Sequence, residues 1–109
     1  MAYSEELNAR IHKTIARWND THSKKMFGGI CYLLNGNMFC GIQNDALIVR
    51  LSDSVAQQAL RQTHIKPFNP TGKPMKGWVL VPQQALQTDS DLRKWLDQAR
   101  QFTKTLPAK

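Results

Sequence analysis

Two cysteines, Cys31 and Cys40, are the residues of this 109-residue chain whose spacing first suggests chemistry. They flank Asn35-Gly36, a strong signal for a two-residue β-hairpin loop, because a type I′ turn needs positive φ at both central positions. Counting outward from that loop places Cys31 opposite Cys40 at a non-hydrogen-bonded pair, within reach of a disulfide. We expect either two reduced, buried thiols or a reversible redox pair.

A metal site is the third interpretation of the cysteines, and it is the weakest. A structural zinc site needs four ligands, and none of the three histidines has a paired spacing with the thiols. These histidines are His12, His22 and His64. We therefore predict no metal at this position.

The segment 61–76 is the second candidate, because no acidic residue occurs between Asp53 and Asp89. Aromatic residues Phe68 and Trp78 lie nearby, and basic plus aromatic side chains suit contacts with a nucleic-acid strand. The competing interpretation is a solvated loop whose aromatic rings fill the core. No helix-turn-helix, zinc finger or RNA-binding motif accompanies the segment. Its candidate nucleic-acid-binding residues are Arg61, Lys66, Lys73 and Lys76.

Composition fits a soluble protein with a basic surface. Fifteen Lys and Arg against eight Asp and Glu give a net charge of +7, which is compatible with a polyanionic partner but bears first on solubility. No apolar stretch approaches the ~20 residues that span a bilayer, and the polar, acidic start is not a signal peptide. We expect a cytoplasmic protein without a membrane partner.

Enzymatic motifs are missing from the sequence. Gly28-Gly29 lacks the spacing of a phosphate-binding loop, and no Gly-x-Ser-x-Gly or His-Glu-x-x-His motif occurs. We therefore predict neither a catalytic residue nor a cofactor.

The elements that position these residues form one domain of the α+β class. Apolar periodicity, capping residues and breakers predict helices over 4–18, from Ser52 or Asp53 to Gln62, and from Thr88 or Ser90 onward. Strands are predicted over 26–34, 37–43, 47–51 and 75–81, with 19–25 as a polar connection and 65–74 as a Pro-rich loop. The order α-βββ-α-β-α indicates a two-layer sandwich of an antiparallel sheet and helices.

Both faces of the predicted hairpin are apolar. One face carries Cys31, Leu33, Met38 and Cys40, and the other carries Ile30, Tyr32, Leu34 and Phe39. An antiparallel sheet with one solvated face alternates with polar residues, so we expect the second face to be covered by a helix or by another copy of the chain.

The ordered series of motifs resembles the N-terminal domain of the TfoX (Sxy) competence regulators of bacteria. The residues that carry the resemblance are Met26-Phe27-Gly28-Gly29, Asn35-Gly36-x-Met38-Phe39-x-Gly41-Ile42, Leu47-Ile-Val-Arg50, Pro67-Phe68, Met75, Pro82, Trp95 and Ala99. The pattern covers about residues 5–100, and Cys40, Ile48 and Arg50 depart from it. The full regulators append a helical domain, so we expect a stand-alone single domain here.

The resemblance implies a two-layer α+β fold and a regulatory role linked to transcription or competence, without catalytic residues. Our first hypothesis is a noncatalytic module that acts through a protein partner or as a homo-oligomer. The second is nonspecific nucleic-acid binding through segment 61–76, and the third is a redox-responsive protein that uses Cys31 and Cys40.

Overall fold

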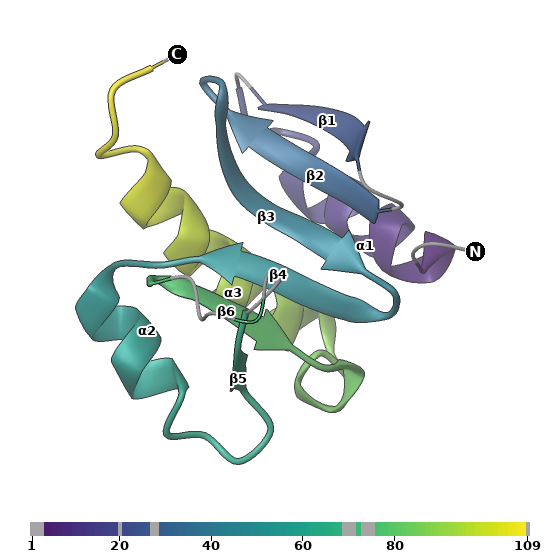
Figure 1. Cartoon of the computed structure of the whole chain (residues 1–109). Helices are drawn as coiled ribbons and strands as arrows, with labels where there is room; N and C mark the ends of the chain where they lie inside the picture. Colours follow the sequence, from purple (N-terminus) through teal and green to yellow (C-terminus); the bar gives the residue numbers. More distant parts are fainter. Residues whose placement is uncertain (1–3, 20, 27–28, 69–71, 73–75, 109) are drawn as a thin grey trace.

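The computed structural model describes residues 4–19, 21–26, 29–68, 72 and 76–108, and it confirms the α+β class. In this part of the chain, three α-helices accompany one antiparallel sheet in the order α-ββββ-α-ββ-α (Figure 1). The helices are α1 (Glu5–Ile15), α2 (Asp53–Ala59) and α3 (Asp89–Thr103), with a short 3₁₀ turn η1 (Gln83–Ala85). The strands are β1 (Thr21–Met26), β2 (Gly29–Leu34), β3 (Asn37–Gln43), β4 (Ala46–Arg50), β5 (Lys66–Pro67) and β6 (Trp78–Val81).

All three helices begin at the caps that the sequence indicates. Ser4 and Ser52 accept backbone hydrogen bonds at the starts of α1 and α2, and Thr88 forms a capping box with Asp91 at the start of α3. Helix α2 ends at Ala59, earlier than predicted, and turns follow it.

The β2–β3 hairpin confirms the Asn35-Gly36 turn but not the full register. Asn35 and Gly36 have φ values of 53° and 84°, as a type I′ turn requires. Beyond the first two pairs a β-bulge intervenes, because Leu33 pairs with Met38 whereas Tyr32 pairs with Cys40. Phe39 is therefore an extra residue in β3, and every pair farther from the turn is shifted by one residue.

Two strands were not predicted. The polar segment predicted to be a connection forms β1, which pairs with β2 along its whole length from Thr21 to Met26. The Pro-rich loop contains the two-residue strand β5, which pairs with β6 at the other edge of the sheet. The strand order is β1-β2-β3-β4-β6-β5. Pro67 is tolerated because β5 is an edge strand. The predicted start of β6 at Met75 lies outside the described residues.

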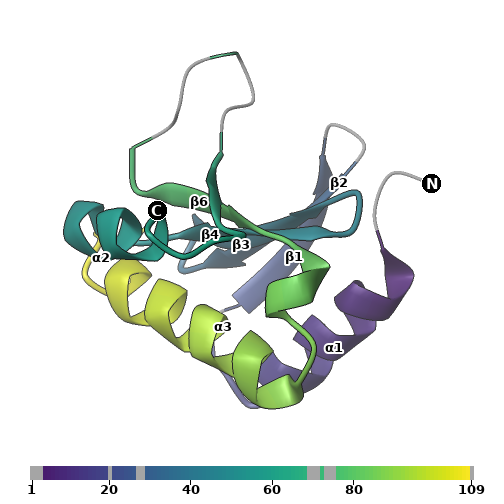
Figure 2. The same ribbon diagram turned by 90° about the horizontal axis from the view of Figure 1, so that it is seen from below.

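The helices lie on one side of the sheet (Figure 2). Helix α3 contacts β3, β4 and α1, and α2 contacts β6. Buried side chains of the helices pack on alternate strand residues of the same face, such as Tyr32, Ile42, Val49 and Val81. We call this the core face, and the opposite side of the sheet the open face. No helix in the described ranges covers the open face, and β5 rises from it (Figure 2).

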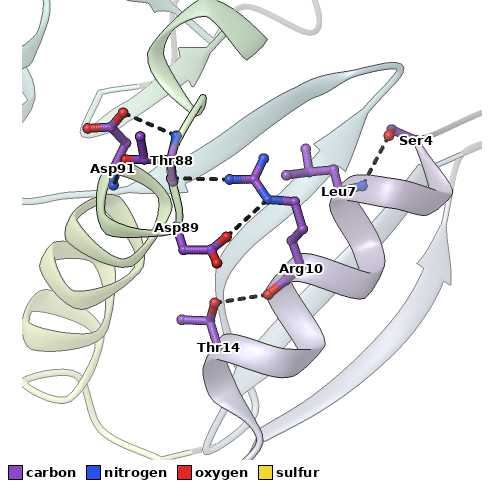
Figure 3. Close-up of polar contacts among 7 residues, drawn as sticks. All are labelled: Ser4, Leu7, Arg10, Thr14, Thr88, Asp89 and Asp91. Atoms are coloured by element: carbon purple, nitrogen blue, oxygen red, sulfur yellow. Dashed lines mark hydrogen bonds and ion pairs between the residues drawn. The ribbon is translucent and has the colours of Figure 1, made fainter.

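Polar contacts join α1 to the start of α3 (Figure 3). The Arg10 guanidinium donates to the backbone oxygen of Thr88 at 3.1 Å, and its Nε lies 3.5 Å from a carboxylate oxygen of Asp89. Asp89 is largely exposed, so its ion pair with Arg10 contributes little to stability. The contact lies where the two helices meet over the core face.

Candidate interaction surface

One row of residues crosses the whole open face. Because paired residues of neighbouring strands point to the same side of a sheet, the register can be followed from one edge strand to the other. The cross-sheet row consists of Lys24, Cys31, Gly41, Ile48, Leu80 and Lys66. Its centre is apolar and small, and each end is a lysine.

Further apolar side chains widen the centre of this row. Leu33 and Met38 form the neighbouring pair on the same side of the sheet. Cys31, Leu33, Met38 and Leu80 are half-buried, and Ile48 is 6% exposed. Ile48 does not belong to the core that the helices cover, so its burial comes from its neighbours on the open face. A contiguous apolar patch therefore lies where no helix of the described chain packs.

A hollow of about 260 Å³ lies at one end of the row. Leu80 supplies an apolar wall, and Lys66 and His64 supply cationic or polar groups. The lining residues are Thr63, His64, Lys66, Leu80, Pro82 and Gln84. The hollow can take an apolar side chain next to a group that pairs with Lys66.

Arg50 lies at the margin of the open face and contacts two aromatic rings. Its guanidinium carbon is 5.5 Å from the ring centroid of Trp78 and 5.6 Å from that of Phe102. Such cation–π contacts orient a guanidinium without neutralising its charge. Among the residues that the structure describes, no carboxylate lies within ion-pair distance of Arg50.

The predicted pairing of Cys31 with Cys40 is wrong. The bulge places Cys31 opposite Gly41 and Cys40 opposite Tyr32, so the two thiols point to opposite faces of the sheet. Both cysteines are free. Burial raises the pKa of the Cys31 thiol, and complete burial raises the pKa of Cys40 further, with a smaller contribution from Cys31. The hypothesis of a redox pair was based on the two cysteines lying opposite each other, and the observed register does not place them so.

The predicted basic residues of segment 61–76 are not gathered on one surface. Lys66 ends the cross-sheet row, whereas Arg61 lies in the exposed turn after α2. The ammonium of Lys76 lies 3.7 Å from a carboxylate oxygen of Asp53, and Lys73 lies outside the described residues. The aromatic rings of Phe68 and Trp78 pack against each other, with centroids 6.2 Å apart.

Lys24 was not among the predicted site residues, because the sequence predicts a connection over 19–25. The alternation of Thr21, Ser23 and Lys25 with His22 and Lys24 carried no apolar signal that would have marked a strand. Across the described residues, no three His, Cys, Asp or Glu side chains are grouped to hold a metal ion. No helix in these residues is long and apolar enough to cross a membrane.

Comparison with known protein families identifies the family to which the chain belongs. The family model of the TfoX N-terminal domain matches residues 13–103, which include the end of α1, the six described strands, α2 and α3. No curated protein matches the chain.

Proposed function

Because the chain belongs to the TfoX N-terminal domain family, we propose that it is a noncatalytic regulatory module that binds a protein partner through its open face. One observation carries the proposal: a contiguous apolar patch, which includes Leu33, Met38 and Leu80, lies on the sheet face that the helices leave uncovered. Apolar patches with a polar rim are typical of protein interfaces.

Nucleic-acid binding is the alternative function, because a net charge of +7 is compatible with a polyanionic partner. The local geometry favours it less, because Lys76 is already paired with Asp53 and Trp78 packs against Phe68 and Arg50. An aromatic ring engaged in this way presents less surface for stacking on a base. We therefore place protein binding first.

Affinity capture from the source cell tests the proposal when it is combined with variants of the open face. In the double variant Leu33→Gln with Met38→Gln, two half-buried side chains become polar at little change in volume. The control variant, Ala9→Gln with Ala16→Gln, introduces the same side chain at exposed positions of α1 and of its C-cap. Circular dichroism and a urea titration establish that both variants are folded.

We expect wild type and control to retain the same partner after nuclease treatment and the open-face variant to lose it. A partner that the open-face variant retains in full would contradict the proposed surface. Capture that nuclease abolishes, together with a mobility shift of a single-stranded oligonucleotide that weakens as salt rises, would favour the nucleic-acid alternative.

A further inference from the structure

We infer that the open face binds an acidic amphipathic helix of a protein partner, whose carboxylates pair with Lys24 and Lys66. This inference rests on the proposed function, because it names the kind of partner that the same surface takes. Three observations support it: the spacing of the two lysines, the charge around the apolar patch, and the hollow beside Leu80.

The spacing sets the length of the partner segment. Lys24 and Lys66 lie on the two edge strands of the sheet, five strand spacings apart along one row. At about 4.8 Å per spacing their Cα atoms are about 24 Å apart, measured along the sheet. Because β5 rises from the open face, the straight distance is shorter than this path, and a helix of at most about 16 residues spans it. Acidic residues in its first and last turns then lie over the two lysines, and its apolar stripe lies over Ile48.

The charge of the open face selects an acidic partner. Neither Lys24 nor Lys66 has a carboxylate within ion-pair distance in the described part of the chain, and His22 lies on the same side. The strand residues described on this face include no Asp or Glu. A second copy of the chain would bring lysine ends against lysine ends, and like charges at an interface are unfavourable. A helix with carboxylates at both ends complements the same row.

The hollow beside Leu80 gives the complex an anchor. An apolar side chain of the helix enters between Leu80 and Pro82, and a carboxylate one turn away reaches the ammonium of Lys66 at its rim. Deep apolar anchors surrounded by polar contacts carry most of the affinity in known interfaces. The other end of the row supplies Lys24 as the second point of attachment.

A set of synthetic helical peptides of about 18 residues tests the inference with the intact chain. All carry the same Leu stripe. The first has Glu in its first and last turns, the second has Gln at those positions, and the third has both Glu residues in its central turn. Titration calorimetry measures the Kd values, and amide chemical-shift changes show where each peptide binds.

Matched charge variants separate the two lysines from the overall positive charge. Lys24→Gln with Lys66→Gln removes the ends of the row, whereas Arg93→Gln with Lys94→Gln removes two exposed charges from α3 on the helix side of the sheet. We expect the first peptide to bind wild type about threefold to tenfold more tightly than the second or third, as two exposed ion pairs allow. We expect this preference to disappear in the variant Lys24→Gln with Lys66→Gln and to persist in the variant Arg93→Gln with Lys94→Gln. Shift changes centre on Cys31, Ile48 and Leu80.

Several results would overturn the inference. The inference fails if the three peptides bind equally or if the two charge variants have equal effects. It also fails if the shift changes are confined to the helices, or if a single-stranded oligonucleotide binds more tightly at the row. If the peptides fail but the open-face variant still loses the cellular partner, the acidic helix is wrong and the proposed function stands. If the cellular partner also binds independently of the open face, both are wrong.

Discussion

Met38 extends along its own strand, β3, over Gly41, and its terminal methyl carbon lies 2.9 Å from where a Cβ atom on Gly41 would stand. The backbone oxygen of Ile30 lies 2.8 Å from the same point. The Gly41 position of the cross-sheet row therefore has no room for a side chain, even though the backbone of Gly41 needs no left-handed conformation. The glycine lets the neighbouring strand and Met38 approach closely.

Gly41→Ala is accordingly expected to destabilise the fold. A methyl group at this position meets a carbonyl oxygen that cannot rotate away, and overpacking of this kind costs about 1–3 kcal/mol. Urea unfolding measures the change in the free energy of unfolding. In the background Met38→Ala the penalty should shrink but persist, because the contact with Ile30 remains. An unchanged urea midpoint for Gly41→Ala alone would contradict this packing.

Gly72 and Gly77 form a matched pair for separating backbone strain from steric contact. Their φ values are +86° and +84°, but a Cβ on Gly72 meets nothing within 4 Å among the described residues, whereas one on Gly77 lies 2.7 Å from the backbone oxygen of Leu51. Both alanine variants incur about 1–2 kcal/mol from the left-handed backbone. We expect Gly77→Ala to lose at least a further ~1 kcal/mol in urea unfolding. Equal losses of stability in the two variants would mean that the backbone at Leu51 moves to make room for the added methyl group.

The two thiols should react with alkylating reagents at very different rates. Cys31 is half-buried on the open face, whereas Cys40 is 0% exposed. Mass spectrometry after iodoacetamide treatment of the native protein should show modification of Cys31 and protection of Cys40 until denaturant is added. Slow modification of Cys31 is expected near neutral pH, because burial raises its pKa and lowers the thiolate fraction. Rapid labelling of Cys40 without denaturant would contradict the bulged register.

Cys40 should also make stability fall at alkaline pH. Burial raises its pKa in the folded state, so above the ordinary thiol pKa the unfolded chain binds fewer protons than the folded one. This contribution is intact below the ordinary thiol pKa and is lost as pH rises toward the folded-state value, by at most about 1.4 kcal/mol per pH unit. Urea unfolding from about pH 7 to pH 10 should show a shallower decline for Cys40→Ala than for wild type. Parallel declines would show that other groups dominate.

Thr88 and Asp89 are adjacent, but their removal should have unequal effects. Thr88→Ala removes the capping box of α3 and should lower stability by about 1 kcal/mol. Asp89→Asn removes the exposed ion pair with Arg10 and one negative charge from the first turn of α3, so it should lower stability by less than Thr88→Ala, by about 0.5 kcal/mol. A larger loss from Asp89→Asn would mean that the contact between α1 and α3 depends on charge.

Local chemistry made much of the fold predictable. Ser4 and Thr88 satisfy the first amide groups of their helices, and Asn35-Gly36 adopts the positive φ values that its turn needs. These features depend on residues that are close together in the sequence, so they can be predicted from it. The same holds for the apolar stripe of α3, which is buried at Leu92 and Leu96.

The cross-sheet row was not predictable, because it depends on contacts between strands. The unbulged register would have turned Gly41 toward the core face, and a slip of one residue changes the face of every side chain beyond it. Phe39 and Cys40 are both apolar, so no polar residue marked the place of the bulge. Strand β1 owes its conformation to pairing with β2 and not to its own composition. The position of Lys24 on the open face therefore follows only from the pairing of β1 with β2.

The order of elements along the chain also has a consequence for synthesis on the ribosome. The four-strand meander is complete at Arg50, but α3, which packs on β3 and β4, begins only at Asp89. Ile42 and Leu47, buried in the finished domain, leave the ribosome well before this helix exists. The part of the core face over β3 and β4 therefore stays without its helix while the second half of the chain is being made, and apolar surface exposed in this way favours aggregation of a folding intermediate.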